Sequence, residues 1–150
     1  MISFGKNRSL EKHLEAKARE EFFQQISRFS SFLSPILEAH ANRHWRALRL
    51  LLRHLRRNMS PTPALQAYYD SKMRLVLTPV RKARIWLNIM ECWGLQHDPP
   101  GAVLIIDQEN VALYNYLKNA QPREGGKMKV LYSAWWTEET LIRRGMAEIL

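Results

Sequence analysis

The sequence predicts a mainly α-helical protein with a small two-stranded β element in its last third. Three observations favour this fold class. Apolar residues recur at spacings of three and four over most of residues 9–93, the period of an amphipathic helix. Three Ser-Pro or Thr-Pro pairs punctuate this stretch at helical lengths. After residue 95 the period gives way to short apolar runs separated by proline and glycine.

Length and composition favour one compact domain over residues 1–150. At 46% apolar and 25% charged residues, the composition is that of a globular protein. Within this domain we expect a helical hairpin over residues 1–58, a candidate helix-turn-helix over 59–95 and a small α/β portion over 96–150.

The environment expected for this chain is the cytoplasm. A single cysteine, Cys92, excludes an internal disulfide and suits a reducing compartment. The first residues turn polar before a signal peptide could form, and no apolar run approaches the ~18 residues that a membrane span needs.

A hydroxyl residue followed by proline is expected to begin three of the helices. Serine or threonine at the N-cap accepts a hydrogen bond from a free amide of the first turn. Proline at the first helical position loses no hydrogen bond. The pairs are Ser34-Pro35, Thr62-Pro63 and Thr78-Pro79.

The first two helices are expected over residues 9–33 and 35–58. A tight turn between them predicts an antiparallel hairpin. The first carries an apolar stripe opposite a face of alternating charge. The core stripe of the second consists of Leu37, Ala41, Trp45, Leu48, Leu51, Leu52 and Leu55.

The third and fourth helices are expected over residues 63–77 and 79–93. The third carries Asp70 and Arg74 at the i,i+4 spacing of a helical ion pair. The fourth ends at Gly94, a residue type common just after a helix. Only the corner Leu77-Thr78-Pro79 separates the two helices, a length compatible with a helix-turn-helix.

The last third is expected to mix strands and helices. Residues 102–106 form a wholly apolar run that suits a buried strand, and residues 128–135 are β-like. Asp107 can cap a helix over 108–119, and Thr137 can open a last helix to Leu150.

Positive charge is concentrated in one part of the chain. The block from His40 to Arg84 contains eleven basic residues and one acid, Asp70, whereas the remaining residues sum to −1. The net charge of +9 therefore comes from this block. Six of its arginines fall on one face of the predicted second helix: Arg43, Arg46, Arg49, Arg53, Arg56 and Arg57.

This arginine face predicts a surface for a polyanion. Like charges at i,i+3 and i,i+4 each destabilise a helix by ~0.2–0.5 kcal/mol, and no acid on this helix offsets them after Glu38. Guanidinium groups pair bidentately with phosphate and stack on bases. We therefore expect a non-enzymatic nucleic-acid-binding protein, with DNA slightly favoured over RNA.

The fourth helix adds to the predicted interface. Arginine and asparagine are the residue types that bind guanine and adenine edges in the major groove. The full set of predicted binding residues is Arg43, Arg46, Arg49, Arg53, Arg56, Arg57, Arg81, Lys82, Arg84 and Asn88.

Three other interpretations of the basic face stay open. It could meet an acidic protein partner, in which case the chain is a helical adaptor or a small subunit of a larger assembly. The alternation of leucine and arginine could also place a helix on an anionic membrane surface. In the last interpretation the arginine-rich face is simply solvated and binds no partner.

No catalytic residue, metal or cofactor is expected. His40 and His44 have a spacing that can hold a metal, but no further ligand is fixed nearby. Asp107 and Glu138 occupy positions that helix caps and first-turn acids explain. Trp135 and Trp136 could stack on bases, although strand alternation should bury at least one of them.

Overall fold

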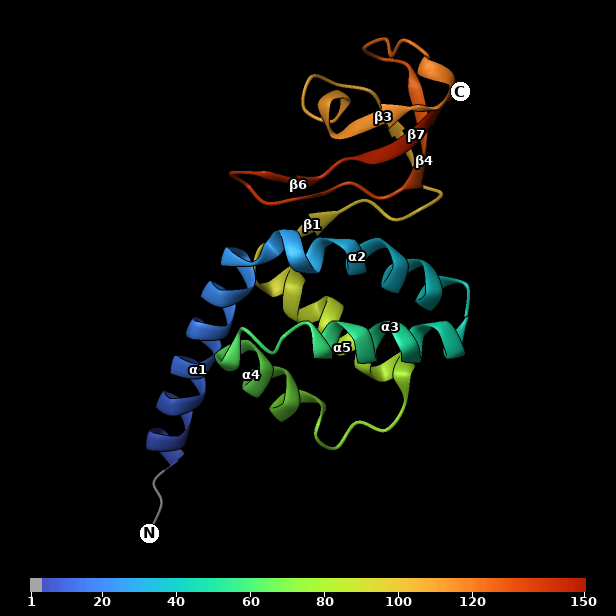
Figure 1. Cartoon of the computed structure of the whole chain (residues 1–150). Coiled ribbons are helices and arrows are strands. Elements are labelled where there is room, and N and C mark those ends of the chain that lie inside the picture. The colour runs from blue at the N-terminus through green and yellow to red at the C-terminus, as the bar shows by residue number, and fades with distance from the viewer. Residues whose placement is uncertain (1–3) are drawn as a thin grey trace. The chain divides into compact units, whose positions relative to one another are not determined.

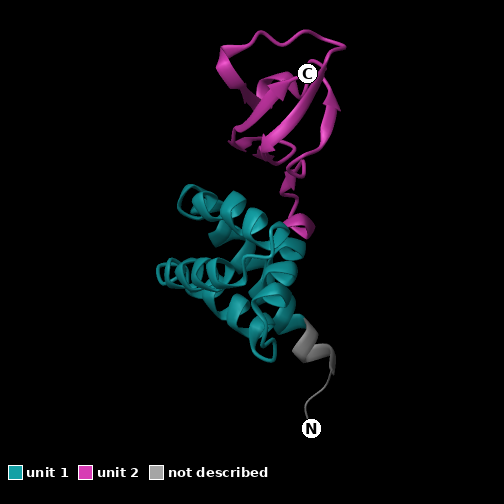
Figure 2. Ribbon diagram, turned by 90° about the vertical axis from the view of Figure 1, so that its right-hand side faces the viewer, with its two compact units in different colours: residues 1–89 teal, residues 90–150 magenta. Residues whose placement is uncertain are grey.

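A computed structural model describes residues 4–150 of the chain (Figure 1). Contacts divide the chain into two compact units, residues 1–89 and 90–150 (Figure 2). The first unit is helical, and the second consists of short strands and turns. The expected mainly α class with a β portion is confirmed, but the β portion is larger than two strands.

The described part of the first unit is built from five helices. Helix α1 packs along α4, and α2 packs on α3. In Figure 1 the chain turns back on itself between α2 and α3. The bounds are α1 Phe4–Gln24, α2 Ile26–Ala41, α3 Trp45–Arg57, α4 Pro63–Met73 and α5 Pro79–Cys92, whose last residues belong to the second unit.

The first predicted helix is broken at Gln25, whose φ of −113° and ψ of 23° are not helical and separate α1 from α2. Helix α2 then continues through Pro35, so the prediction that Ser34-Pro35 begins a helix is wrong. An interior proline costs a helix about 3 kcal/mol. The apolar stripe continues across it, with Leu33 and Ile36 both buried, and this packing opposes the cost.

The antiparallel hairpin forms between α2 and α3. Its turn lies between Ala41 and Trp45, and not near residue 34 as predicted. Arg43 adopts a left-handed φ of 57°. The His44 amide donates to the Ala39 carbonyl at 2.9 Å, and the Arg43 amide donates to the His40 carbonyl at 3.3 Å, which ends α2 in a Schellman motif. Arg43 stands where glycine is usual, so the sequence carried no signal for this turn.

The predicted second helix, residues 35–58, is therefore divided: residues 35–41 form the end of α2, and residues 45–57 form α3. Ala41 and Trp45 belonged to its expected core stripe, but both are exposed. Leu48, Leu52 and Leu55 are buried as predicted.

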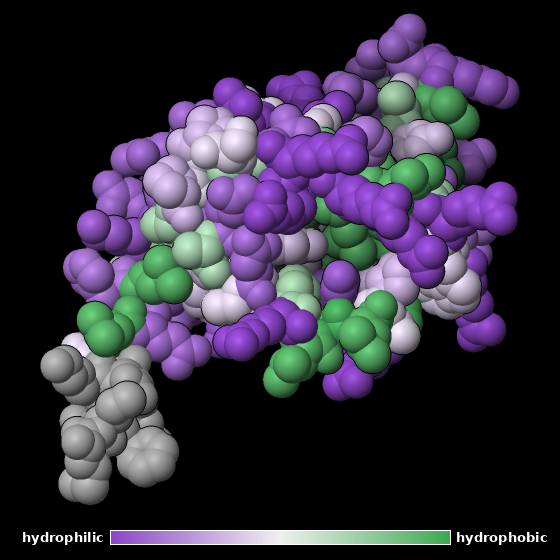
Figure 3. All heavy atoms as spheres, turned by 60° about the horizontal axis from the view of Figure 1, so that its bottom comes forward, coloured by the Kyte–Doolittle hydropathy of each residue, from purple (hydrophilic) through white to green (hydrophobic). Residues whose placement is uncertain are grey.

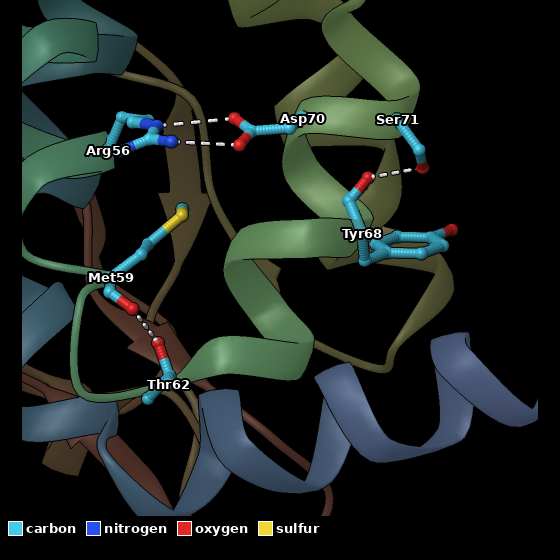
Figure 4. Close-up of polar contacts among 6 residues, drawn as sticks. All are labelled: Arg56, Met59, Thr62, Tyr68, Asp70 and Ser71. Atoms are coloured by element: carbon cyan, nitrogen blue, oxygen red, sulfur yellow. Dashed lines mark hydrogen bonds and ion pairs between the residues drawn. The ribbon is translucent and has the colours of Figure 1, made fainter.

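Helix α4 begins at Pro63 as predicted, but a different residue caps it. The Thr62 hydroxyl donates to the Met59 carbonyl at 2.8 Å (Figure 4). The Glu21 carboxylate of α1 instead accepts from the Ala64 amide at 2.9 Å and from the Leu65 amide at 3.4 Å. A carboxylate at this end also complements the helix dipole.

Helix α5 begins and ends at the predicted signals. The Thr78 hydroxyl accepts from the Arg81 amide at 3.4 Å. At the other end Gly94 has a φ of 95°, and the Leu95 amide donates to the Met90 carbonyl at 3.0 Å. Leu95 and Met90 are both buried, in keeping with the apolar contact that often accompanies a Schellman cap.

Helix α4 ends at Met73, so the third predicted helix is four residues too long. A five-residue connection, residues 74–78, links α4 to α5, in place of the shorter corner that was expected. Leu75 and Leu77 in this connection are 87% and 90% exposed.

An aromatic cluster forms the centre of the first unit. Phe22 stacks on Phe29 with ring centroids 5.6 Å apart, and makes a T-shaped contact with Trp86 at a centroid distance of 5.7 Å. Tyr69 also packs on Trp86 in a T-shaped contact, with ring centroids 5.6 Å apart. These contacts join α1, α2, α4 and α5 around one core.

Two small sheets form the second unit. Strands β1, β5 and β6 make an antiparallel sheet, and the other sheet has the order β2-β4-β7-β3, in which only the β7–β3 pair is parallel. The strands are β1 Gln96–His97, β2 Val103–Ile105, β3 Tyr114–Tyr116, β4 Lys127–Tyr132, β5 Trp135–Trp136, β6 Leu141–Arg143 and β7 Gly145–Ile149.

The helix predicted over residues 108–119 is wrong. Asp107 Oδ1 does accept from the Glu109 and Asn110 amides, at 2.9 and 2.7 Å. The turn that these bonds close continues only into a short 3-10 helix, Val111–Leu113, before the chain becomes β3. Tyr114 in β3 is buried in the core of the second unit.

The last predicted helix, from Thr137 to Leu150, is also wrong. Thr137 closes a tight turn, in which its amide donates to the Thr140 carbonyl at 2.8 Å. The chain then forms β6 and β7. Gly145 begins β7 where the backbone of Ala134 and the ring of Tyr114 leave no room for a Cβ.

The predicted strand over residues 102–106 exists as β2, but it is not wholly buried. It lies at an edge of its sheet, and Val103 and Ile105 are 56% and 65% exposed. The predicted β segment over 128–135 is confirmed by β4 and the start of β5. Trp135 is buried and Trp136 is half-buried, as strand alternation predicted.

Candidate functional site

Helix α3 separates leucines from arginines as its sequence predicts. Leu48, Leu52 and Leu55 are at most 5% exposed and face the core. The six arginines of the predicted face are all exposed, although Arg43 lies in the turn before α3 rather than on it. The guanidinium groups of α3 therefore emerge into water, which the binding hypothesis requires.

Residues of α3, α4, α5 and the α4–α5 connection surround a hollow of about 670 Å³ in the first unit. We call it the basic hollow. Six cations and one carboxylate line it, a net charge of +5. Its lining is Arg49, Leu52, Arg53, Arg56, Arg57, Tyr69, Asp70, Met73, Arg74, Leu77, Pro79 and Lys82.

Charged and apolar side chains share this face of the molecule. Figure 3 turns the lower side of the Figure 1 view towards the reader, and there long hydrophilic side chains lie beside a group of apolar ones. Among the apolar residues that line the basic hollow, Leu52, Tyr69 and Met73 are buried, whereas Leu77 is exposed. The hollow thus combines a buried apolar floor with a charged rim.

One arginine of the basic hollow is paired within the fold. Arg56 Nη2 lies 2.8 Å from Asp70 Oδ2, and Arg56 Nε lies 3.2 Å from Asp70 Oδ1 (Figure 4). The hydrogen bonds to Asp70 raise the pKa of Arg56. Asp70 therefore pairs across helices with Arg56, and the Asp70–Arg74 pair predicted within one helix is wrong.

The other five cations of the basic hollow have no carboxylate partner among the described residues. Neither the Arg56–Asp70 ion pair nor the Lys72–Glu11 ion pair involves these five. The side chains concerned are Arg49, Arg53, Arg57, Arg74 and Lys82.

Tyr69 contributes no negative charge at neutral pH. Burial raises its pKa to about 12, the nearby Asp70 charge adds to this rise, and Arg56 opposes it. The phenol therefore stays protonated beneath the cations. The electrostatics of the basic hollow are set by its arginines, its lysine and Asp70 alone.

The structure splits the predicted binding residues into two groups. Five of them line the basic hollow: Arg49, Arg53, Arg56, Arg57 and Lys82. The other five are exposed elsewhere on the first unit, namely Arg43, Arg46, Arg81, Arg84 and Asn88. Recognition of base edges by the exposed side of α5 stays a prediction.

Sequence reasoning missed Arg74 as a site residue, because the i,i+4 rule assigned it to Asp70. The structure places Arg74 on the wall of the basic hollow. The cross-helix competitor Arg56 lies fourteen residues from Asp70 in the sequence. Local spacing could not have identified that pairing.

The two histidines considered for a metal do not share a helix. His40 lies on α2, whereas His44 follows the turn after it. His40 Nε2 is buried without a hydrogen-bond partner, and its ring meets Trp45 at 6.5 Å. Over residues 4–150, no group of three or more His, Cys, Asp or Glu side chains is placed to hold a metal ion.

A second hollow, of about 620 Å³, lies in the second unit and is acidic. Two of its carboxylates have roles within the fold. Asp98 accepts from the Tyr114 hydroxyl at 2.9 Å, and Asp107 closes the turn described above. The carboxylates that line it are Asp98, Asp107, Glu109, Glu138 and Glu139.

His97, close to this acidic hollow in sequence, is held by stacking. Its ring lies 4.3 Å from that of Trp135. Burial lowers the pKa of His97, against the opposing charges of Glu91 and Asp98. The imidazole and the indole therefore pack on one another within the second unit.

No protein-family model, curated protein or solved structure matches this chain. None of the described helices combines the length and apolar character needed to cross a bilayer.

Proposed function

We propose that this chain binds nucleic acid through the basic hollow and catalyses no reaction. The observation that carries the proposal is a set of five cations around one hollow, none with a carboxylate partner among the described residues. Four of the five are arginines, which suits bidentate contact with phosphate.

The energetics of the free protein support this proposal. The arginines of α3 repel one another along one helix, and Asp70 neutralises only Arg56. Proteins tolerate such local conflicts chiefly at functional sites. A bound polyanion supplies the missing counter-charge, and a single small anion could pair with only part of it.

Salt dependence tests the proposal directly. If all five unpaired cations contact phosphates, log K should fall against log salt with a slope of about −4.5 on duplex DNA and −3.5 on a single strand. We expect this result from fluorescence anisotropy with labelled DNA and RNA, using nuclease-treated protein. A flat salt response would exclude the proposed function.

Substitutions locate the contact. Arg49→Ala with Arg53→Ala should make the slope shallower by about 1.4–1.8, because two phosphate contacts are lost. The charge-matched control is Arg123→Ala with Arg144→Ala, two exposed arginines of the second unit. If both double variants make the salt slope equally shallow, binding depends on the total charge of the chain and not on the basic hollow.

A further inference from the structure

Two leucines stand almost fully exposed in the connection that contributes Arg74 and Leu77 to the basic hollow. Leu75 and Leu77 lie in the α4–α5 connection and are 87% and 90% exposed. Leu77 lines the hollow itself. Arg74 precedes this pair in the sequence and also lines the hollow. The rim therefore presents apolar surface directly among the cations.

Exposed leucines at this position gain nothing from a ligand that offers phosphate alone. The outside of a duplex presents phosphate and sugar, and stacking covers the faces of its bases. An unpaired strand exposes base faces together with its phosphates. Of these two forms of nucleic acid, the unpaired strand is the one that matches both the apolar surface of Leu77 and the charge of its neighbouring arginines.

The size of the hollow points the same way. A volume of about 670 Å³ falls within the ~300–1,000 Å³ range of sites that enclose one small molecule. Such a hollow can take in about one or two nucleotides. A duplex would lie across its mouth and could not enter it.

We propose that the basic hollow binds single-stranded nucleic acid, with phosphates on its unpaired cations and bases against Leu75 and Leu77. This inference rests on the proposed function and names its ligand class. Apolar contact with bases is indifferent to their identity, so binding should show little sequence preference.

The test compares single strands with the duplex of the same sequence, at equal length and salt. The wild-type chain should bind the single strand about tenfold more tightly or better. Leu75→Ser with Leu77→Ser should weaken single-strand binding about 10–100-fold, because each leucine loses a large part of its burial. Binding of the duplex and of inorganic polyphosphate should change less than about twofold.

Leu10→Ser is the matched control, since Leu10 is 61% exposed on α1 and does not line the hollow. It should leave both affinities unchanged. Circular dichroism should show all variants folded, because each altered side chain is exposed. A Leu77→Trp variant adds a second readout, and its indole fluorescence should be quenched by single strands.

The outcomes separate this inference from the proposed function. If no form of nucleic acid binds, the proposed function fails, and this inference fails with it. If the duplex binds as tightly as the single strand, or the serine variant binds normally, only the single-strand inference is overturned. If the Leu75→Ser, Leu77→Ser variant loses the wild-type chain's binding to phosphatidylserine vesicles but binds nucleic acid normally, the inference is overturned in favour of a membrane contact.

Discussion

Replacing Arg49 and Arg53 by alanine should stabilise the free protein. On α3 these residues take part in three like-charge pairs of arginines that have no carboxylate partner among the described residues, Arg46–Arg49, Arg49–Arg53 and Arg53–Arg57. A fourth, with Arg56, is partly offset by the ion pair that Arg56 makes. At ~0.2–0.5 kcal/mol a pair, relief of the three amounts to about 0.6–1.5 kcal/mol.

Two smaller effects accompany this gain. Alanine has a slightly higher helix propensity than arginine, which adds to the stabilisation. Arginine stems can cover apolar surface, so removing them from around Leu52 and Met73 reduces the gain in stability. The net expectation is about 1 kcal/mol, or a rise in Tm of roughly 2–4 °C for a chain of this size.

The assay is thermal unfolding followed by circular dichroism at low salt and at about 1 M salt. At 1 M the Debye length is about 3 Å, so repulsion between exposed charges is screened and the gain should vanish. The control Arg123→Ala with Arg144→Ala should not change Tm at either salt concentration. A lower Tm, or a gain that persists at high salt, would refute the claim that the basic face is electrostatically strained.

Three further substitutions test the fold around the site and beyond it. Asp70→Asn should cost at most about 1 kcal/mol, since the pair is exposed, and should steepen the salt slope of binding by about 0.7–0.9 as Arg56 becomes available. Glu21→Ala should lower the free energy of unfolding in urea by about 1–2 kcal/mol, because the first amides of α4 lose their acceptor. Gly145→Ala should cost about 3 kcal/mol or more, measured in the same way, because its Cβ would overlap neighbouring backbone.

Much of the helical unit could be predicted because its signals are local. Thr78 and Gly94 bound α5 where capping rules place them. The turn at Arg43 could not be predicted in the same way, because an arginine occupies the left-handed position where glycine is the usual signal. Pro35 misled for the opposite reason, since packing on both sides of it outweighs a local helix breaker.

The second unit shows why the same local signals fail among strands. Asp107 and Thr137 each form the hydrogen bonds of a cap, and each cap closes a turn and not a helix. A side chain can accept hydrogen bonds from amides two or three residues ahead both at the start of a helix and in a tight turn. What decides between them is the pairing of β3 and β4 with β7, which involves residues far apart in the sequence.

The candidate site follows the same division between local and distant information. The amphipathic pattern of α3 predicts that its arginines face water, and the structure shows them exposed. Their assembly into a hollow depends on where α4 and α5 lie, which brings Arg74 and Lys82 to the same place. Asp70, the only acid of the basic block, is committed to Arg56, so the surplus charge resides in the five remaining cations. Because no carboxylate of the described chain offsets that surplus, the counter-charge must come from solvent ions or from a ligand, and a polyanion gains affinity by displacing those ions.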